Sequence, residues 1–272
     1  MTRNLFLALL FTAAVLPSNA PLQADGPVTF TRFLVPIYTP DTPGAHGSLW
    51  QVRTWIYYAG TEEAVMVPRP FCFGITCPLA GALQPDWPAV PFQHLSGFPE
   101  PAILVHIDSR FASEAAFASR VRDLSMAADS AGTEVRVVPE GEMSTGPVYL
   151  LNVPASPKFR TTLRVYALPE VQDPEVEVRY FRQPDDQGSR LDTDVVLLRT
   201  DRVRLRTRRD GGELQLYPSI VEIGALDALP ELAGEDAIWI EVVPITPHLR
   251  IWALLSVTNN ETQQVTVVSP HW

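Results

Sequence analysis

The stretch EVEVRYF, residues 175–181, alternates polar and apolar side chains. Successive side chains of an extended chain point to opposite faces, so Val176, Val178 and Tyr180 share one face and the charged residues share the other. This alternation is typical of a strand in a sheet that is buried on one side. The passage therefore predicts a half-buried antiparallel sheet.

Similar runs of β-branched and aromatic residues, separated by Pro, Gly, Asp or Asn, recur from residue 27 onward. They predict strands at Val28–Tyr38, Trp50–Tyr58, Ala102–Ile107, Glu134–Val138, Val148–Val153, Thr161–Leu168, Glu175–Phe181, Asp194–Arg206, Glu213–Tyr217, Ala237–Val243, Arg250–Val257 and Gln264–Val268. Only Ser113–Ala118 and Leu226–Leu232 look helical. Closely spaced strands without intervening helices favour antiparallel sandwiches over a parallel α/β sheet.

An internal repeat divides the chain. At an offset of 130 residues, RVRDLSMAADSAGTEVRVV (120–138) aligns with RIWALLSVTNNETQQVTVV (250–268), and each copy predicts two strands around a polar turn. We expect an all-β protein of two tandem, immunoglobulin-like antiparallel β-sandwich domains, at residues 21–145 and 146–272.

The first residues predict export. Arg3 precedes an apolar run from Leu5 to Leu16, and the small-residue pattern Ser18-Asn19-Ala20 follows. This order is typical of a secretory signal peptide, and the run is shorter than the roughly 20 residues that span a bilayer. We expect a signal peptide at residues 1–20, with Ala24 as the alternative end, and a periplasmic or extracellular mature chain without a transmembrane segment.

The charge argues against nucleic acid as a partner. The chain of 272 residues carries 21 basic and 31 acidic side chains, for a net charge of −10. A DNA-binding domain would normally present a basic excess. The hydrophobic content of 46% is enough for a substantial core.

Two segments carry a resemblance. They are Pro43-Gly44-Ala45-x-Gly47-Ser48-x-Trp50, and Ile251-Trp252-Ala253 with Ser256-Val257-Thr258-Asn259-Asn260-Glu261-Thr262 and Val265-Thr266. Both resemble segments of uncharacterised exported β-sandwich repeat proteins of environmental bacteria. The resemblance implies the fold and export, and it implies no activity, ligand or catalytic residue. Within this pattern we expect Trp252 in the core and Asn259-Asn260 in a turn that tolerates left-handed backbone.

Cys72 and Cys77 are the two cysteines of the chain, in the segment CFGITC. An even count in an exported protein favours a disulfide, with free thiols as the alternative. A redox site would need C-x-x-C on a thioredoxin-like frame, and a zinc site would need further ligands. We therefore predict a structural disulfide and no metal or cofactor.

No catalytic motif emerges. The five histidines, at positions 46, 94, 106, 248 and 271, have no metal-ligand spacing, and Ser48 lacks the G-x-S-x-G context of a nucleophile. An acidic cluster offers oxygen ligands for calcium but not the EF-hand spacing, and a solvated hairpin loop is the alternative. The cluster consists of Asp185, Asp186, Asp192 and Asp194.

An arginine row alternates with smaller residues along one predicted strand, which places the guanidiniums on one face about 7 Å apart. Its members are Arg202, Arg204, Arg206 and Arg208. The row could bind a polyanion. The alternative is cross-strand pairing with Glu175, Glu177 or Glu213, after a turn at Asp210-Gly211-Gly212.

A long insert at residues 71–101 contains six prolines and five aromatic residues. Long irregular segments in compact domains often have a function. Aromatic faces suit stacking on sugar rings or on a proline-rich peptide, and a cover packed over the sandwich is the alternative. The candidate ligand-binding residues are Trp87, Phe92, His94 and Phe98.

The sequence favours an exported, non-enzymatic binding, adhesion or structural module whose partner is a cell-wall or extracellular glycan or another surface protein. The alternative is an accessory or catalytic protein that acts on extracellular polysaccharide. Two carboxyl groups about 5–10 Å apart in an aromatic cleft would favour the enzyme.

The cysteine pair gives a first prediction. If Cys72 and Cys77 are bonded, thiol titration of the denatured, unreduced mature protein should detect essentially no free thiol. The stabilisation should be modest, because the loop that the bond closes is short. Two free thiols per chain would show that the bond is absent.

Overall fold

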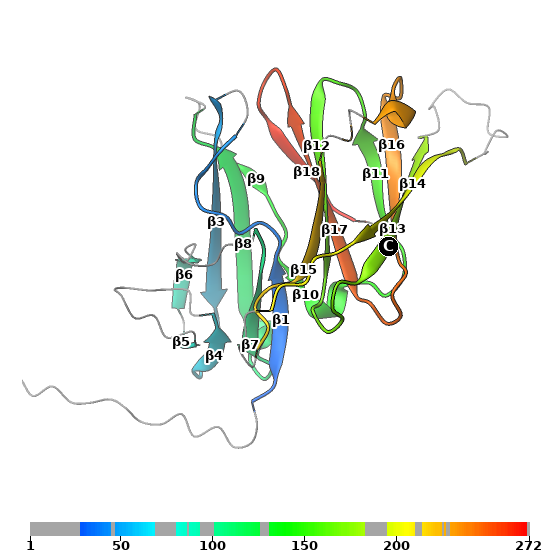
Figure 1. Ribbon diagram of the computed structural model, residues 1–272. Helices are drawn as coiled ribbons and strands as arrows, with labels where there is room; N and C mark the ends of the chain where they lie inside the picture. Colours follow the sequence, from blue (N-terminus) through cyan, green and yellow to red (C-terminus); the bar gives the residue numbers. More distant parts are fainter. Residues whose placement is uncertain are drawn as a thin grey trace, which may run out of the picture.

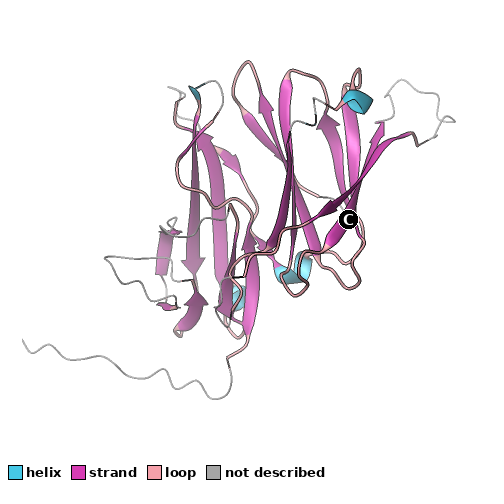
Figure 2. Cartoon of the chain, in the orientation of Figure 1, coloured by secondary structure: helices cyan, strands magenta, loops and turns pink. Residues whose placement is uncertain are grey.

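The computed structural model describes residues 28–44, 47–68, 80–85, 87–92, 101–125, 131–182, 195–209, 214–224, 226 and 229–270, with the backbone alone at 87–92. Strands dominate this part of the chain (Figure 2). Short 3-10 helices accompany them: η2 (Ala112–Glu114), η3 (Glu140–Glu142) and η5 (Pro230–Leu232). No helix in the described ranges is long and apolar enough to cross a bilayer. The predicted all-β class with antiparallel sheets is confirmed.

The first sandwich contains sheets A and B. Sheet A consists, in order, of β10 (Val138–Pro139), β1 (Phe30–Val35), β7 (Ile103–Asp108), β4 (Ala64–Val67) and β5 (Gly81–Leu83). Sheet B consists of β2 (Thr42–Pro43), β3 (Leu49–Tyr58), β8 (Ala115–Asp123) and β9 (Thr133–Glu134), and β6 (Trp87–Phe92) also pairs with β3.

The second sandwich contains sheets C and D. Sheet C consists, in order, of β15 (Ser219–Gly224), β12 (Phe159–Ala167), β17 (Ile251–Asn259) and β18 (Val265–Val268). Sheet D consists of β11 (Val148–Pro154), β16 (Ala237–Pro244), β13 (Glu175–Arg182) and β14 (Leu197–Arg204).

The repeat is present in the strand order. The path β1-β7-β4-β5 of sheet A matches β11-β16-β13-β14 of sheet D, and β6-β3-β8-β9 matches β15-β12-β17-β18. The ungapped alignment is wrong in register: it would carry the pair of Val121 and Thr133 to Ile251 and Gln263, whereas β17 pairs with β18 through Thr258 and Val265. Constant-type immunoglobulin domains keep their first two strands in one sheet, but β11 and β12 belong to different sheets.

Alternation along the strands builds the cores. Val176, Val178 and Tyr180 of β13 are fully buried between sheets C and D, as the sequence predicts. Sheets A and C are covered on both faces. In β1, Phe33 packs into the first core while Leu34 points to the other side.

An interface cluster of apolar residues joins the two sandwiches. Its buried members are Leu34, Ala102, Leu104, Val121, Val135, Val138, Met143, Tyr166, Leu168, Ile220, Trp252 and Leu254. Trp252 is 1% exposed, which confirms it as a core residue. The layers therefore follow the order B, A, C and D (Figure 1).

An arm from the second sandwich enters the first. Residues 214–217, between β14 and β15, do not form the predicted strand at Glu213–Tyr217. Leu216 instead packs into the first core, and its carbonyl accepts a hydrogen bond of 2.7 Å from the backbone N–H of Leu104. The yellow segment in Figure 1 follows this path toward β1 and β10. The described part of the expected strand therefore contacts the first sandwich, and the turn expected at residues 210–212 lies outside the described residues.

Two other expectations change. The helix expected at Ser113–Ala118 is wrong beyond Glu114, where η2 ends. From Ala115 the chain forms β8, whose nine residues pair continuously with β3. The insert at 71–101 contains β5 and β6, so part of it belongs to the sheets. Pro88 and Pro91 fit β6 because that strand pairs on one side with β3.

The interface cluster predicts a large cost for truncation. Leu254→Ala should lower the free energy of unfolding by about 2–5 kcal/mol, since it leaves a cavity between sheets A and C. Leu124→Ala removes the same atoms from a side chain that is 38% exposed and should cost less than about 0.5 kcal/mol. Urea unfolding of both variants measures the difference, and equal values would argue against a shared core.

Candidate functional site

A cleft of about 460 Å³ lies between sheet B and the outer face of sheet C. The first sandwich contributes Ile37, Thr39, Thr42, Trp50, Val52, Pro101 and Val121, and the second contributes Arg160, Thr162, Arg164, Glu222, Ser256, Thr258, Val265 and Val267. One wall is thus mainly apolar and aromatic, and the other is mainly polar. The cleft ends where the interface cluster begins, because Trp50, Val52 and Val267 also pack against that cluster.

The polar wall arises within β12 and β17. On the outer face of β12, Arg160, Thr162 and Arg164 occupy alternate positions before the buried Tyr166. In β17 the same face changes from the buried Leu254 to Ser256 and Thr258. One half of each strand thus covers sheet A with apolar side chains, namely Tyr166 in β12 and Leu254 in β17. The other half carries polar side chains that line the open cleft.

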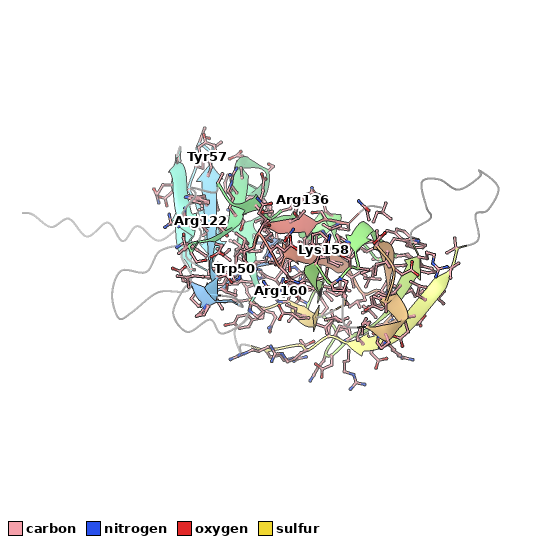
Figure 3. All side chains as sticks on the ribbon, turned by 90° about the horizontal axis from the view of Figure 1, so that it is seen from above. Trp50, Tyr57, Arg122, Arg136, Lys158 and Arg160 are labelled. Atoms are coloured by element: carbon pink, nitrogen blue, oxygen red, sulfur yellow. The ribbon has the colours of Figure 1, made fainter. Side chains whose placement is uncertain are left out.

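The apolar wall arises because β3 is long. Ile56 and Tyr58, at one end of the strand, pack into the first core. Trp50 and Val52, at the other end, face sheet C and line the cleft. In Figure 3, which looks down on the molecule, Trp50 and Arg160 lie next to each other on the two sandwiches.

Trp50 rests against the backbone of Gly44. A Cβ atom on Gly44 would lie 2.3 Å from the indole Nε1 of Trp50 and 2.3 Å from the hydroxyl of Ser48. The backbone N–H of Gly44 also donates to the carbonyl of Ser48, at 2.8 Å. Glycine at this position therefore allows the close approach that sets the position of the indole ring.

The two arginines of the polar wall have different partners. The Nε of Arg164 lies 2.5 Å from the carboxylate of Glu222, and its Nη1 donates to the hydroxyl of Ser256 at 3.1 Å. The Nη2 of Arg160 donates to the side-chain carbonyl of Gln263 at 2.9 Å. Arg160 forms no ion pair with any residue that the structure describes.

A smaller hollow of about 310 Å³ adjoins the cleft and shares Trp50, Val121 and Val265 with it. Burial of Asp123 in its wall raises the pKa of this carboxyl. Hydrogen bonds from the backbone of Leu49 and from Ser125 lower the same pKa by more than burial raises it, so that it lies below its usual value. Asp123 is therefore a carboxylate at neutral pH, which does not suit a general acid.

The strand that carries the arginine row is shorter than expected. β14 ends at Arg204, and the backbone of Arg206 pairs with Ile220 of β15. Arg202 and Arg204 both contact the carboxylate of Glu175, which holds the pKa of that carboxyl below its usual value. Glu175 is the partner that the pairing alternative names, and polyanion binding by the row stays a prediction.

Arg208 lies over the ring of Tyr217, with its guanidinium carbon 5.6 Å from the ring centre. All four arginines of the row are exposed, and the residues between them are buried or half-buried. Arg206 and Arg208 lie in the chain between β14 and the arm.

Several predicted residues lie outside the described part of the chain. Cys72, Cys77, His94, Phe98 and the acidic cluster (Asp185, Asp186, Asp192 and Asp194) are among them. Trp87 and Phe92 begin and end β6, whose backbone pairs with the half of β3 that is remote from Trp50. The disulfide and the ligand contacts of the insert remain predictions, and calcium binding by the acidic cluster remains an open alternative to a solvated hairpin loop.

The sequence analysis did not identify Trp50 and Arg160 as site residues, although strands were predicted at or beside both. A signal was present in the segment RTTLRVYAL, residues 160–168, where the positions opposite the core change from Arg and Thr to Tyr and Leu. Such a change within one strand indicates that part of a face is covered and part is open.

Comparison of the chain with known protein families, with curated proteins and with solved structures finds no match. Function must therefore be argued from the site itself.

The contact between Gly44 and Trp50 gives a prediction. Gly44→Ala should displace the indole ring, because the new methyl group has no room beside Nε1. The indole N–H resonance of Trp50 should shift in a two-dimensional NMR spectrum. Gly141→Ala is the control, since a Cβ there meets no atom within 4 Å. An unchanged Trp50 resonance in Gly44→Ala would contradict this account of the cleft wall.

Proposed function

We propose that the protein is an exported binding module that holds a carbohydrate in the cleft between its two sandwiches. The observation that carries the proposal is the contrast between the walls, with Trp50 on one side and Arg160, Thr162 and Thr258 on the other. Sugar rings have apolar faces and hydroxyl-bearing edges. A tryptophan offers a face for stacking, and hydroxyl and guanidinium groups offer hydrogen bonds to the edges.

The size of the cleft supports the same proposal. Its volume of about 460 Å³ lies within the range of about 300–1,000 Å³ that is usual for small-molecule sites. Its position between two sandwiches is also typical of binding sites. The cleft is open at its surface, so a chain of sugars could extend beyond it.

Binding fits the carboxyl groups of the cleft better than hydrolysis does. Glycoside hydrolysis needs a general acid with a raised pKa beside a second carboxylate. Glu222 is ion-paired with Arg164, and the pKa of Asp123 is lowered. Neither described carboxyl is placed as a proton donor, which favours a non-enzymatic module over the polysaccharide-degrading alternative.

The proposal moves the predicted glycan contact along β3. The insert reaches the sheet through β6, beside Thr54 to Tyr58, whereas the cleft lies at the Trp50 end of the strand. The partner class expected from the sequence is unchanged, but the residues that we propose to bind it are different.

The test is a binding measurement on variants. Trp50→Ala should reduce affinity about tenfold for any oligosaccharide that the mature protein binds in calorimetric titrations. Loss of an aromatic stacking partner costs a nucleobase ligand about 1–3 kcal/mol, and about 1.4 kcal/mol corresponds to tenfold in affinity. The panel should contain neutral xylan and galactan fragments and oligogalacturonate.

Trp239→Ala is the matched control. Trp239 lies on the outer face of sheet D, between the buried Ile238 and Ile240, and its ring stacks on Phe181 with 3.9 Å between ring centres. This face points away from sheet C and from the cleft. Affinity should survive in this variant. Melting temperatures measured in parallel separate loss of binding from loss of folding. Full affinity in a folded Trp50→Ala protein would refute the cleft as the binding site.

A further inference from the structure

We propose that the ligand of the cleft is an acidic glycan whose sugar carboxylate is bound by Arg160. This proposal rests on the proposed function and adds the charge of the ligand to it. It is argued from the partner of Arg160, from the turn that holds this partner, and from the groups that surround both.

Arg160 is oriented by a neutral side chain. Its Nη2 donates to Oε1 of Gln263 at 2.9 Å, while Nε2 of Gln263 donates to the carbonyl of Asn260 at 2.7 Å. The second hydrogen bond fixes which end of the amide faces the guanidinium. A neutral amide holds an arginine in place without cancelling its charge.

Arg164 shows the opposite arrangement on the same wall. Its charge is matched by the carboxylate of Glu222, and Ser256 takes another of its N–H groups. Among the residues that the structure describes, the guanidinium of Arg164 thus has an ion-pair partner and that of Arg160 has none. Since the whole chain carries a net charge of −10, an anion would be repelled by most of the protein and attracted locally at Arg160.

The turn between β17 and β18 is built to present Gln263. Asn259 accepts hydrogen bonds from the N–H groups of Glu261 and Thr262, and the amide of Asn260 donates to the carbonyl of Pro157. The left-handed residue of this turn is Gln263, with φ of 56°, and not the Asn pair expected from the sequence. A left-handed backbone is uncommon for a residue other than glycine. Here it occurs at Gln263, whose side chain binds Arg160.

A uronate sugar carries the three kinds of group that match the lining of the cleft: a carboxylate, an apolar ring face and hydroxyl groups. A guanidinium binds a carboxylate through paired, charge-assisted hydrogen bonds. The same ring offers an apolar face to Trp50 and hydroxyl groups to Thr162 and Thr258.

A peptide strand fits less well, because strand addition needs a free sheet edge. The described cleft is lined mainly by side chains from the faces of β3, β12 and β17, whereas the edge strands β2, β15 and β18 contribute the side chains of Thr42, Glu222, Val265 and Val267. The hydroxyl of Thr133 in β9 donates to the carbonyl of Val265 in β18. The lining that remains open consists of side chains, which suits a sugar.

The experiment compares acidic glycans with their neutral counterparts. Oligogalacturonate, oligoalginate and hyaluronan fragments are titrated into the mature protein beside the same oligosaccharides with the carboxyl groups reduced to alcohols. At least one acidic oligosaccharide should bind about tenfold or more tightly than its reduced form, and this preference should shrink with added salt.

Two variants test the role of Arg160. Arg160→Gln should bring the ratio of acidic to reduced affinity close to one while binding of the reduced form persists. Gln263→Glu should do the same with the guanidinium still present, because the new carboxylate compensates it. Arg136→Gln is the control, since it removes one positive charge from an exposed arginine paired with Glu142 and should leave the ratio unchanged.

The outcomes separate the two proposals. Equal affinity for acidic and reduced oligosaccharides in the unmodified protein would overturn the acidic ligand and leave carbohydrate binding intact. Absence of binding to every oligosaccharide of both panels would overturn the proposed function and this inference together. An acidic preference that survives in Gln263→Glu and in a folded Arg160→Gln protein would overturn the role of Arg160.

Discussion

The contact between the outer faces of sheets A and C determines how the rest of the molecule is arranged. Trp252 and Leu254 of β17 are buried against Leu34 and Leu104 of sheet A. Burial of such side chains contributes roughly 1.5–3 kcal/mol each. The buried hydroxyl of Tyr166 helps to orient the two sandwiches, because it donates a hydrogen bond to the carbonyl of Pro36 in the other sandwich. Two domains that share a core of this kind do not move independently of each other.

The arm gives the pair of sandwiches a second attachment. Leu216 lies in the core of the first sandwich although it follows β14 of the second in the chain. A third attachment lies near the link between the units, where Ser144 and Ile251 exchange two backbone hydrogen bonds of 2.9 and 2.8 Å. With three attachments the distance between sheet B and sheet C is fixed. A ligand therefore meets a preformed cleft, which lowers the entropy cost of binding.

Local periodicity predicted what each strand does by itself. The alternation in residues 175–181 placed Val176, Val178 and Tyr180 correctly in a core. It could not predict the arm, because Leu216 finds its partner Leu104 more than a hundred residues away. The cleft could not be predicted from the sequence for the same reason. Trp50 and Arg160 line the same cleft only after two separate sandwiches have packed together. The residues near either one in the chain do not indicate this packing.

The polarity of β12 explains why the cleft stays open beside an apolar contact. If sheets B and C closed on each other over the cleft, as sheets A and C do at the interface cluster, Arg160 and Thr162 would be buried against Trp50 and Val52. Burying an uncompensated guanidinium against apolar side chains is strongly unfavourable. The walls therefore remain apart unless something between them supplies both an apolar face and a counter-charge. The feature that prevents collapse is thus the same feature that would select the acidic ligand we propose.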